Sequence, residues 1–278
     1  MRQQVRRLFA CAAAMLAAAL TVGCAVSPDK PESDSLALLQ HRQTAASAAR
    51  VEGRRMWFAG FAMNTRSSAF LGDLQLVKDR LASLGHPLFS YEFSNAWQGR
   101  ELQRPYATLH TLGQAMERIG RQARPDDIVV LLVSTHGGVG LLSVNANGLD
   151  YPPITADQLA DVLKPLQDTP TVIVLSACHS GSFIPRLQGD NRIILTAASA
   201  ARSSFGCAFE DRNTWFVEAL FGPRFDASAS LSQLMTQAKA TITEREVLMK
   251  YPASEPQIWI GPKARWLAER PLNDWWQL

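Results

Sequence analysis

Two uninterrupted hydrophobic runs constrain the fold of this 278-residue chain more than any other feature. Residues 127–135 (DIVVLLVST) and 171–177 (TVIVLSA) lack the apolar–polar alternation of a half-exposed strand, so each is expected to be buried on both faces. Because helical periods separate the expected strands, we predict an α/β fold with a mainly parallel central sheet flanked by helices. The other strands are expected at 56–62, 88–93, 192–197 and 257–260, a hairpin at 141–151, and helices at 69–84, 109–123, 155–166, 215–221 and 231–250.

Each of the two hydrophobic runs is followed directly by a reactive side chain. His136 and Gly137 come after the first run, and Cys178 comes after the second. Ligands collect outside the carboxyl ends of parallel strands, so an imidazole and a thiol meet there if the two strands are neighbours. A nearby imidazole promotes the thiolate, which is the nucleophilic form of cysteine. Gly137 is predicted to form an oxyanion hole from its backbone N–H together with that of Cys178.

Three other interpretations of the same residues stay open at this point. Cys178 and Cys207 are two thiols that an oxidising compartment can join in a disulfide. His179 adjoins the nucleophile, but successive residues of an extended chain point in opposite directions, which makes it a poorer base than His136. A zinc site at Cys178, His136 and His179 lacks a fourth ligand at a suitable spacing. Catalysis by the thiol and imidazole requires no metal or organic cofactor.

The order of these motifs resembles the legumain family of caspase-like cysteine peptidases. Residues 177–182 (ACHSGS) are similar to the nucleophile loop of that family, and 196–198 with 203–207 are similar to the segment lining its specificity pocket. The triplet 64–66 (NTR) resembles the family's Asn-x-Arg. The resemblance spans about 55–221 and implies a caspase-like three-layer sandwich at 51–278 that acts on peptide or protein substrates.

The resemblance also implies roles for single residues. Asn64 is expected to orient the catalytic imidazole, and Arg66 and Ser203 are expected to bind the substrate side chain. Legumain has an acidic residue two positions before its nucleophile, where this chain has Ser176. A second acidic pocket residue has only Glu210 and Asp211 as nearby candidates. The implied activity is an endopeptidase cleaving after Asn or Asp, or transferring the acyl group, and this departure leaves the preference open.

The N-terminus is expected to direct the chain out of the cytoplasm. Arg2, Arg6 and Arg7 precede an apolar stretch at 8–22 that is too short and alanine-rich for a membrane span, so 1–23 is predicted to be a signal peptide. The net charge is +3, and these three arginines account for the whole excess. The remaining chain is balanced in charge, which gives no reason to expect a nucleic acid partner.

Cys24 is expected to carry a lipid. It follows Gly23 at the end of the apolar stretch, which resembles a bacterial lipobox, although Thr21 occupies the place of the usual leucine. An ordinary signal peptide is the alternative. Residues 24–50 are rich in Ser, Pro, Ala and Gln and are predicted to be a flexible tether. The expected location is the bacterial cell envelope, as a periplasm-facing lipoprotein on the outer membrane. A catalytically silent, lipid-anchored protein that binds partners is the alternative to an enzyme.

Overall fold

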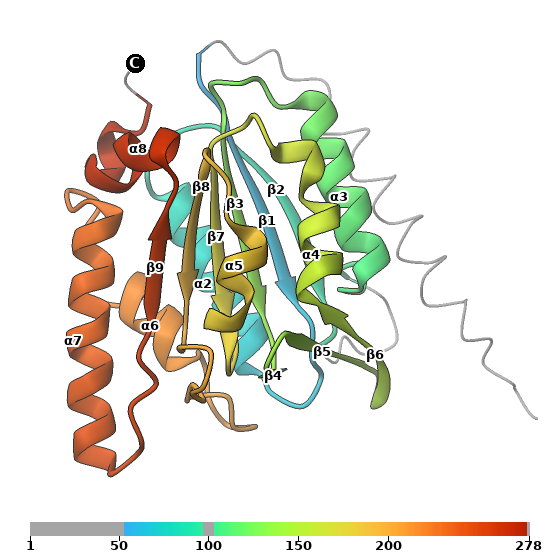
Figure 1. The fold of residues 1–278 in the computed structure, drawn as a ribbon, viewed down its shortest axis with the longest axis vertical. Helices are drawn as coiled ribbons and strands as arrows, with labels where there is room; N and C mark the ends of the chain where they lie inside the picture. The colour runs from blue at the N-terminus through green and yellow to red at the C-terminus, as the bar shows by residue number, and fades with distance from the viewer. Residues whose placement is uncertain (1–52, 97–102, 277–278) are drawn as a thin grey trace, which may run out of the picture.

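The computed structural model describes residues 53–96 and 103–276. The predicted signal peptide (1–23), Cys24 and the tether (24–50) lie outside these residues. A six-stranded sheet in the order β2-β1-β3-β7-β8-β9 forms the centre of the protein (Figure 1). Its first five strands in this order are parallel, and β9 pairs antiparallel with β8. The strands are β1 (Met56–Ala62), β2 (Leu88–Ser94), β3 (Ile128–Ser134), β7 (Thr171–Ser176), β8 (Arg192–Thr196) and β9 (Gln257–Ile260).

Helices cover both faces of this sheet, which confirms the predicted three-layer α/β fold. In Figure 1, α3, α4 and α5 lie in front of the sheet, and α2 and α6 lie behind it, with α7 and α8 beyond β9. The longer helices begin within one residue of their predicted first residues. The helices are α2 (Ala69–Ala82), α3 (Leu109–Gln122), α4 (Ala156–Val162), α5 (Ile184–Leu187), α6 (Trp215–Phe221), α7 (Leu231–Met249) and α8 (Arg265–Glu269).

The central strands divide their side chains between two separate cores. In β3, Val130 and Leu132 pack into the core on the α2 and α6 side, whereas Val129, Leu131 and Val133 pack into the core on the α3 and α4 side. Every residue of β3 and of β7 is buried. Alternating side chains of a strand point to opposite faces, so this double burial explains why both sequences are hydrophobic throughout.

A second sheet of three short strands lies at the carboxyl edge of the central sheet, below the strand ends in Figure 1. It consists of β4 (Gly137–Gly138), β5 (Leu141–Ala146) and β6 (Leu149–Thr155). Asn147 and Gly148 both have positive φ, 52° and 78°, as a tight hairpin turn requires. The predicted hairpin is confirmed, with a second strand that continues to Thr155.

One predicted helix is divided. Thr155 begins α4 with a reciprocal capping box with Gln158, as expected, but the α-helix ends at Val162. A separate 3₁₀ turn, Lys164–Leu166, contains Pro165. Proline has no backbone N–H to donate and restricts the residue before it, which accounts for the break.

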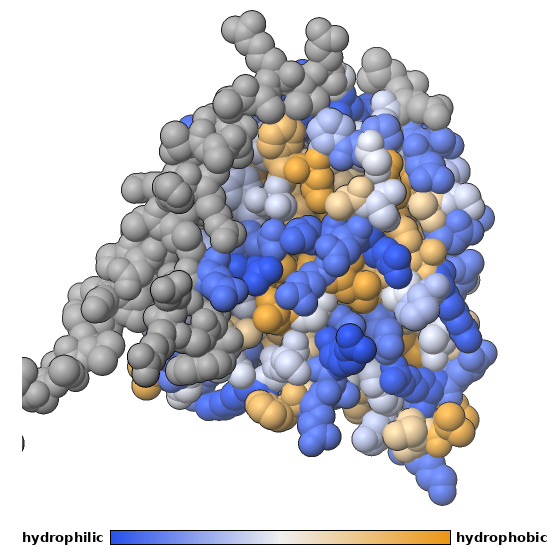
Figure 2. All heavy atoms as spheres, turned by 180° about the vertical axis from the view of Figure 1, so that it is seen from behind, coloured by the Kyte–Doolittle hydropathy of each residue, from blue (hydrophilic) through white to orange (hydrophobic). Residues whose placement is uncertain are grey.

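The surface mixes hydrophilic and hydrophobic residues, as the view from behind in Figure 2 shows. A small hydrophobic group at its lower right corresponds to the end of α7, where Val247, Leu248 and Met249 are exposed. Within the described parts of the chain, no helix is both long and apolar enough to cross a membrane.

Candidate active site

The two strands that lead to His136 and Cys178 are neighbours in the sheet. β3 and β7 pair in parallel, with Ser134 opposite Ser176. The pairing continues one step beyond, because the Thr135 N–H donates to the Ser176 carbonyl at 3.1 Å. His136 and Cys178 each follow this serine pair by two residues, so they leave the sheet side by side at its carboxyl edge.

Backbone contact brings the two loops together at Gly137. A Cβ atom added to Gly137 would lie 2.5 Å from the Cys178 carbonyl oxygen and 3.0 Å from the Ala177 Cβ. Only a residue without a side chain permits this approach. Ser182, in the loop after the nucleophile, adds a second tie, since its hydroxyl accepts from the Gly140 N–H at 2.8 Å.

We expect Gly137→Ala to lower the free energy of unfolding by about 1–3 kcal/mol, the usual cost of overpacking. The added methyl group meets backbone of the Cys178 loop, which must move to accept it. Urea unfolding of the variant measures this cost. The control is Gly138→Ala, because nothing lies within 4 Å of an added Cβ there. Equal stability of the two variants would contradict the close approach.

The Cys178 sulfur lies against the loop that follows β8. The Ser204 N–H is 3.3 Å from Sγ, and the Ser204 hydroxyl is 3.7 Å from it. The Ser204 carbonyl is 3.6 Å from Sγ and can accept the thiol proton. Ser203, the residue expected from the sequence, is exposed. Its neighbour Ser204 therefore makes the contacts to the nucleophile, which the sequence pattern did not single out.

His136 is half-buried, and its ring meets the Phe70 ring edge-on at a centroid distance of 5.0 Å. Burial lowers the pKa of His136, and the positive charge of Arg66 lowers it further. The imidazole is therefore neutral at pH 7 and has a lone pair available for a proton.

Asn64 acts on the histidine loop through the backbone of the hairpin. Its Nδ2 donates to the Ser143 hydroxyl at 3.1 Å, and its Oδ1 accepts from the Arg66 N–H at 3.0 Å. Ser143 in turn donates its N–H to the His136 carbonyl at 2.9 Å. Asn64 is therefore linked to the His136 backbone through Ser143, and its side-chain oxygen and nitrogen bond to Arg66 and Ser143.

Arg66 extends from the loop after β1 to the hairpin. Its guanidinium forms an ion pair with Asp150 at 2.9 Å, and both side chains are about 60% exposed (60% and 62%). Asp150 also accepts from the Asn145 Nδ2 at 2.7 Å. An exposed ion pair of this kind adds little to stability. The positive charge of Arg66 therefore remains available to a ligand at the carboxyl edge.

The alternative base, His179, has one ring nitrogen bonded to the loop after β8. Its Nδ1 lies 3.1 Å from the Ala200 carbonyl, and its backbone is left-handed with φ 58°. Cys178 and Cys207 are both free thiols. Within residues 53–96 and 103–276, no group of three or more His, Cys, Asp or Glu side chains is arranged to hold a metal ion.

The position two residues before the nucleophile is buried and polar. The Ser176 hydroxyl lies 2.8 Å from the Thr214 hydroxyl, and Thr214 is bonded to the carboxylate of Asp73. Of the two acidic candidates named from the sequence, Glu210 is exposed, and Asp211 accepts from the Ala208 N–H within its own loop. Asp73 on α2 was not a candidate, because its position below the site appears only in three dimensions.

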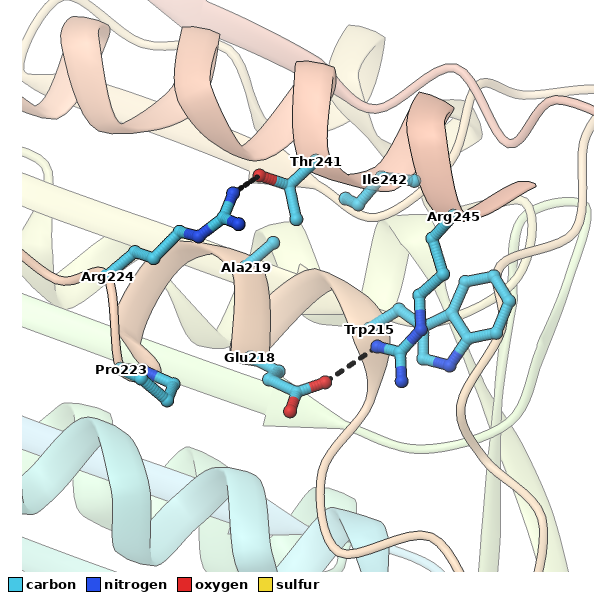
Figure 3. Close-up of a pocket in the computed structure, with 8 residues that line it drawn as sticks. All are labelled: Trp215, Glu218, Ala219, Pro223, Arg224, Thr241, Ile242 and Arg245. Atoms are coloured by element: carbon cyan, nitrogen blue, oxygen red, sulfur yellow. Dashed lines mark hydrogen bonds and ion pairs between the residues drawn. The ribbon is translucent and has the colours of Figure 1, made fainter. Parts of the chain in front are cut away.

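A cavity of about 300 Å³ lies elsewhere, between α6 and α7 (Figure 3). Arg245 stacks on Trp215 and pairs with Glu218 at its rim, and neither His136 nor Cys178 lines it. The reactive residues instead occupy the open carboxyl edge of the sheet.

The fold is that of the caspases. Caspase-1 from Spodoptera frugiperda matches with a TM-score of 0.51 over 75% of this chain and 86% of that chain, at 18% sequence identity, which establishes the fold alone. The model of the Peptidase C13 family matches residues 107–263, more than half of the chain. The chain therefore belongs to the Peptidase C13 family, and the resemblance found in its motifs is confirmed. The vacuolar-processing enzyme of Citrus sinensis is 36% identical over 88 residues, which are 30% of this chain and 17% of that protein.

Proposed function

We propose that the protein is a cysteine endopeptidase in which Cys178 is the nucleophile and His136 the general base. One observation carries the proposal: both residues leave adjacent parallel strands two positions beyond the same serine pair, with Gly137 packed on the Cys178 backbone. Membership of the Peptidase C13 family agrees with this chemistry.

The proposed reaction has two stages. The Cys178 sulfur attacks the peptide carbonyl carbon while His136 takes the thiol proton, and the carbonyl oxygen becomes an oxyanion. The N–H groups of Gly137 and Cys178 are the proposed donors to that oxyanion. His136 then protonates the departing amine and the C–N bond breaks. Water, activated by His136, attacks the thioester and restores the thiol; an amine in place of water gives transpeptidation.

The proposed substrate is a peptide with a small polar side chain before the scissile bond. The resemblance to the family suggests that this residue is Asn or Asp. Arg66 supplies a positive charge near His136, which supports binding of such a side chain. Ser203 is a proposed second contact. The buried Ser176 stands where the family has an acidic residue, so this chain offers no carboxylate at that position to a substrate asparagine.

A peptide-library digest that compares wild type with Cys178→Ala tests activity and preference together. Wild type is expected to cleave a subset of peptides with a shared residue before the cut, and the variant is expected to cleave none. No cleavage by either protein would favour the silent partner-binding alternative, and identical cleavage by both would show that Cys178 is not the nucleophile.

We further propose that Cys24 carries the lipid and anchors the protein in the bacterial envelope. Cys24→Ser is expected to move the protein from the membrane fraction to the soluble periplasmic fraction, since a lipid anchor supplies the membrane affinity. Fractionation and the mass of the mature N-terminus measure this. A soluble wild-type protein that begins elsewhere than Cys24 would indicate an ordinary signal peptide.

A further inference from the structure

A carboxyl group with no exposed surface lies below the proposed catalytic pair. Asp73, on α2, is completely buried and accepts four hydrogen bonds. Its Oδ2 accepts from the hydroxyls of Ser134 at 2.7 Å and Thr214 at 2.8 Å. Its Oδ1 accepts from the Thr214 N–H at 2.9 Å and the Asn213 Nδ2 at 3.3 Å. None of these partners is charged. A buried carboxylate held only by neutral donors is costly, so stability alone does not account for its presence.

The hydrogen bonds of Asp73 join the two strands that carry the reactive residues. Ser134 on β3 bonds to Asp73 directly, and Ser176 on β7 reaches it through the Thr214 hydroxyl, 2.8 Å away. Ser134 and Ser176 are opposite each other in the β3–β7 pairing. The bridge therefore spans the pair at its last rung, two residues before His136 and Cys178. Residues two apart on a strand share a face, so the bridge also lies on their side of the sheet.

The carboxylate also sets the direction of the hydrogen bonds in the bridge. A hydroxyl group has one proton to donate. Because Thr214 gives its proton to the ionised Asp73, Ser176 must donate to Thr214. Burial raises the pKa of Asp73 to about 7, although hydrogen bonds from Ser134, Thr214 and Asn213 oppose that rise. Near neutral pH the bridge therefore changes between two states. With Asp73 ionised, the hydroxyl protons all point toward its carboxylate, and with Asp73 protonated their direction is no longer fixed.

The groups that face Asp73 from neighbouring elements include one titratable side chain. Cys207, in the loop before α6, has its pKa raised to about 11, first by burial and partly by the charges of Cys178, Asp211 and Asp73. It therefore stays a neutral thiol throughout the range in which Asp73 ionises. The groups bonded to Asp73 from β3 and from the N-terminal end of α6 are the uncharged Ser134, Asn213 and Thr214.

We infer that Asp73 is a positioning residue of the proposed peptidase: by bridging the ends of β3 and β7, it fixes the placement of His136 relative to Cys178. The inference rests on the proposed function. It assigns Asp73 no contact with the substrate, so its loss affects the turnover step more than binding.

The test is Asp73→Asn, with Asp79→Asn as the control. Asp79 is exposed on the same helix, so it reports the same chemical change without the bridge. We expect kcat of Asp73→Asn to fall about 10²-fold, the scale of a misplacement of about 1 Å, and KM to change by less than about threefold. The wild-type rate is expected to rise with pH through the ionisation of Asp73, and this rise is absent in Asp73→Asn. The rate of Cys178 alkylation, which needs no peptide substrate, is expected to fall in Asp73→Asn together with kcat.

Thermal unfolding of each variant accompanies the kinetics. If Asp73→Asn does not fold, Ser134→Ala decides the question, because it cuts the bridge at β3 and leaves three donors on the carboxylate. A tenfold or greater fall in its kcat, with KM retained, supports the inference. A folded variant of either kind with wild-type kcat and pH profile overturns it and leaves the proposed function standing. A wild-type protein that neither cleaves peptides nor reacts at Cys178 overturns both.

Discussion

Cys178→Ala is expected to lower peptide hydrolysis by about 10⁵- to 10⁶-fold, the scale of losing a covalent nucleophile. Neither His179 nor Cys207 is expected to replace it, because His179 is bonded to the Ala200 carbonyl and burial keeps the Cys207 thiol protonated at neutral pH. The variant should keep the wild-type melting temperature to within a few degrees, since the sulfur is half-buried and its contacts are to a surface loop.

Alkylation of the wild-type protein tests the same claim without a substrate. An iodoacetamide reagent reacts with thiolates, and at about pH 8 only about one in a thousand Cys207 side chains is ionised, given a pKa near 11. We therefore expect Cys178 to be labelled much faster than Cys207, as measured by peptide mass spectrometry. Equal labelling of both thiols, or a Cys178–Cys207 disulfide in freshly purified protein, would contradict the nucleophile assignment.

His136→Ala is expected to lower kcat by about 10²- to 10⁴-fold, the usual contribution of a positioned general base. The control is His179→Asn, because Asn tolerates the left-handed backbone at that position. We expect the control to retain activity to within about twofold. A reversal of the two results would assign the base to His179.

The pH profile of the rate sharpens the assignment of His136. A base must be neutral to accept a proton, so activity is lost as pH falls through its pKa. Burial and Arg66 hold that pKa below the ordinary value of 6.5, and the loss attributable to His136 is expected below pH 6.5. Arg66→Gln removes one cause of the lowering and should move this limb to higher pH. An unchanged limb would mean that Arg66 does not act on His136.

The central strands were predictable because their burial on both faces leaves a direct trace in the sequence. The hydrophobic runs at 127–135 and 171–177 form β3 and β7, and these two strands are neighbours in the sheet, as the placement of His136 and Cys178 requires. Helix starts were similarly visible at Thr155, whose capping box with Gln158 is encoded locally. Local chemistry of this kind needs no knowledge of the rest of the fold.

The residues that the sequence did not reveal act across long separations. Ser204 reaches Cys178 over 26 positions, and Asp73 reaches Thr214 over 141. Ser204 lies within the 203–207 motif, but that motif does not indicate a contact with Cys178, and an aspartate within an amphipathic helix is ordinarily solvent-exposed. Their roles follow from the packing of α2 and the 203–214 loop on one face of the sheet, which no short motif specifies.

The central position of β3 and β7 has a consequence for how the protein moves. Each has a hydrogen-bonded strand on both sides, so exposing their amides to solvent requires opening the sheet itself. The hairpin and the 203–214 loop are attached at the edge and can open locally at a much smaller free-energy cost. The histidine and cysteine therefore directly follow the two strands whose amides are expected to exchange most slowly, while the segments around them are expected to open more readily. Such a division lets a substrate displace the surroundings without disturbing the distance between the two reacting groups.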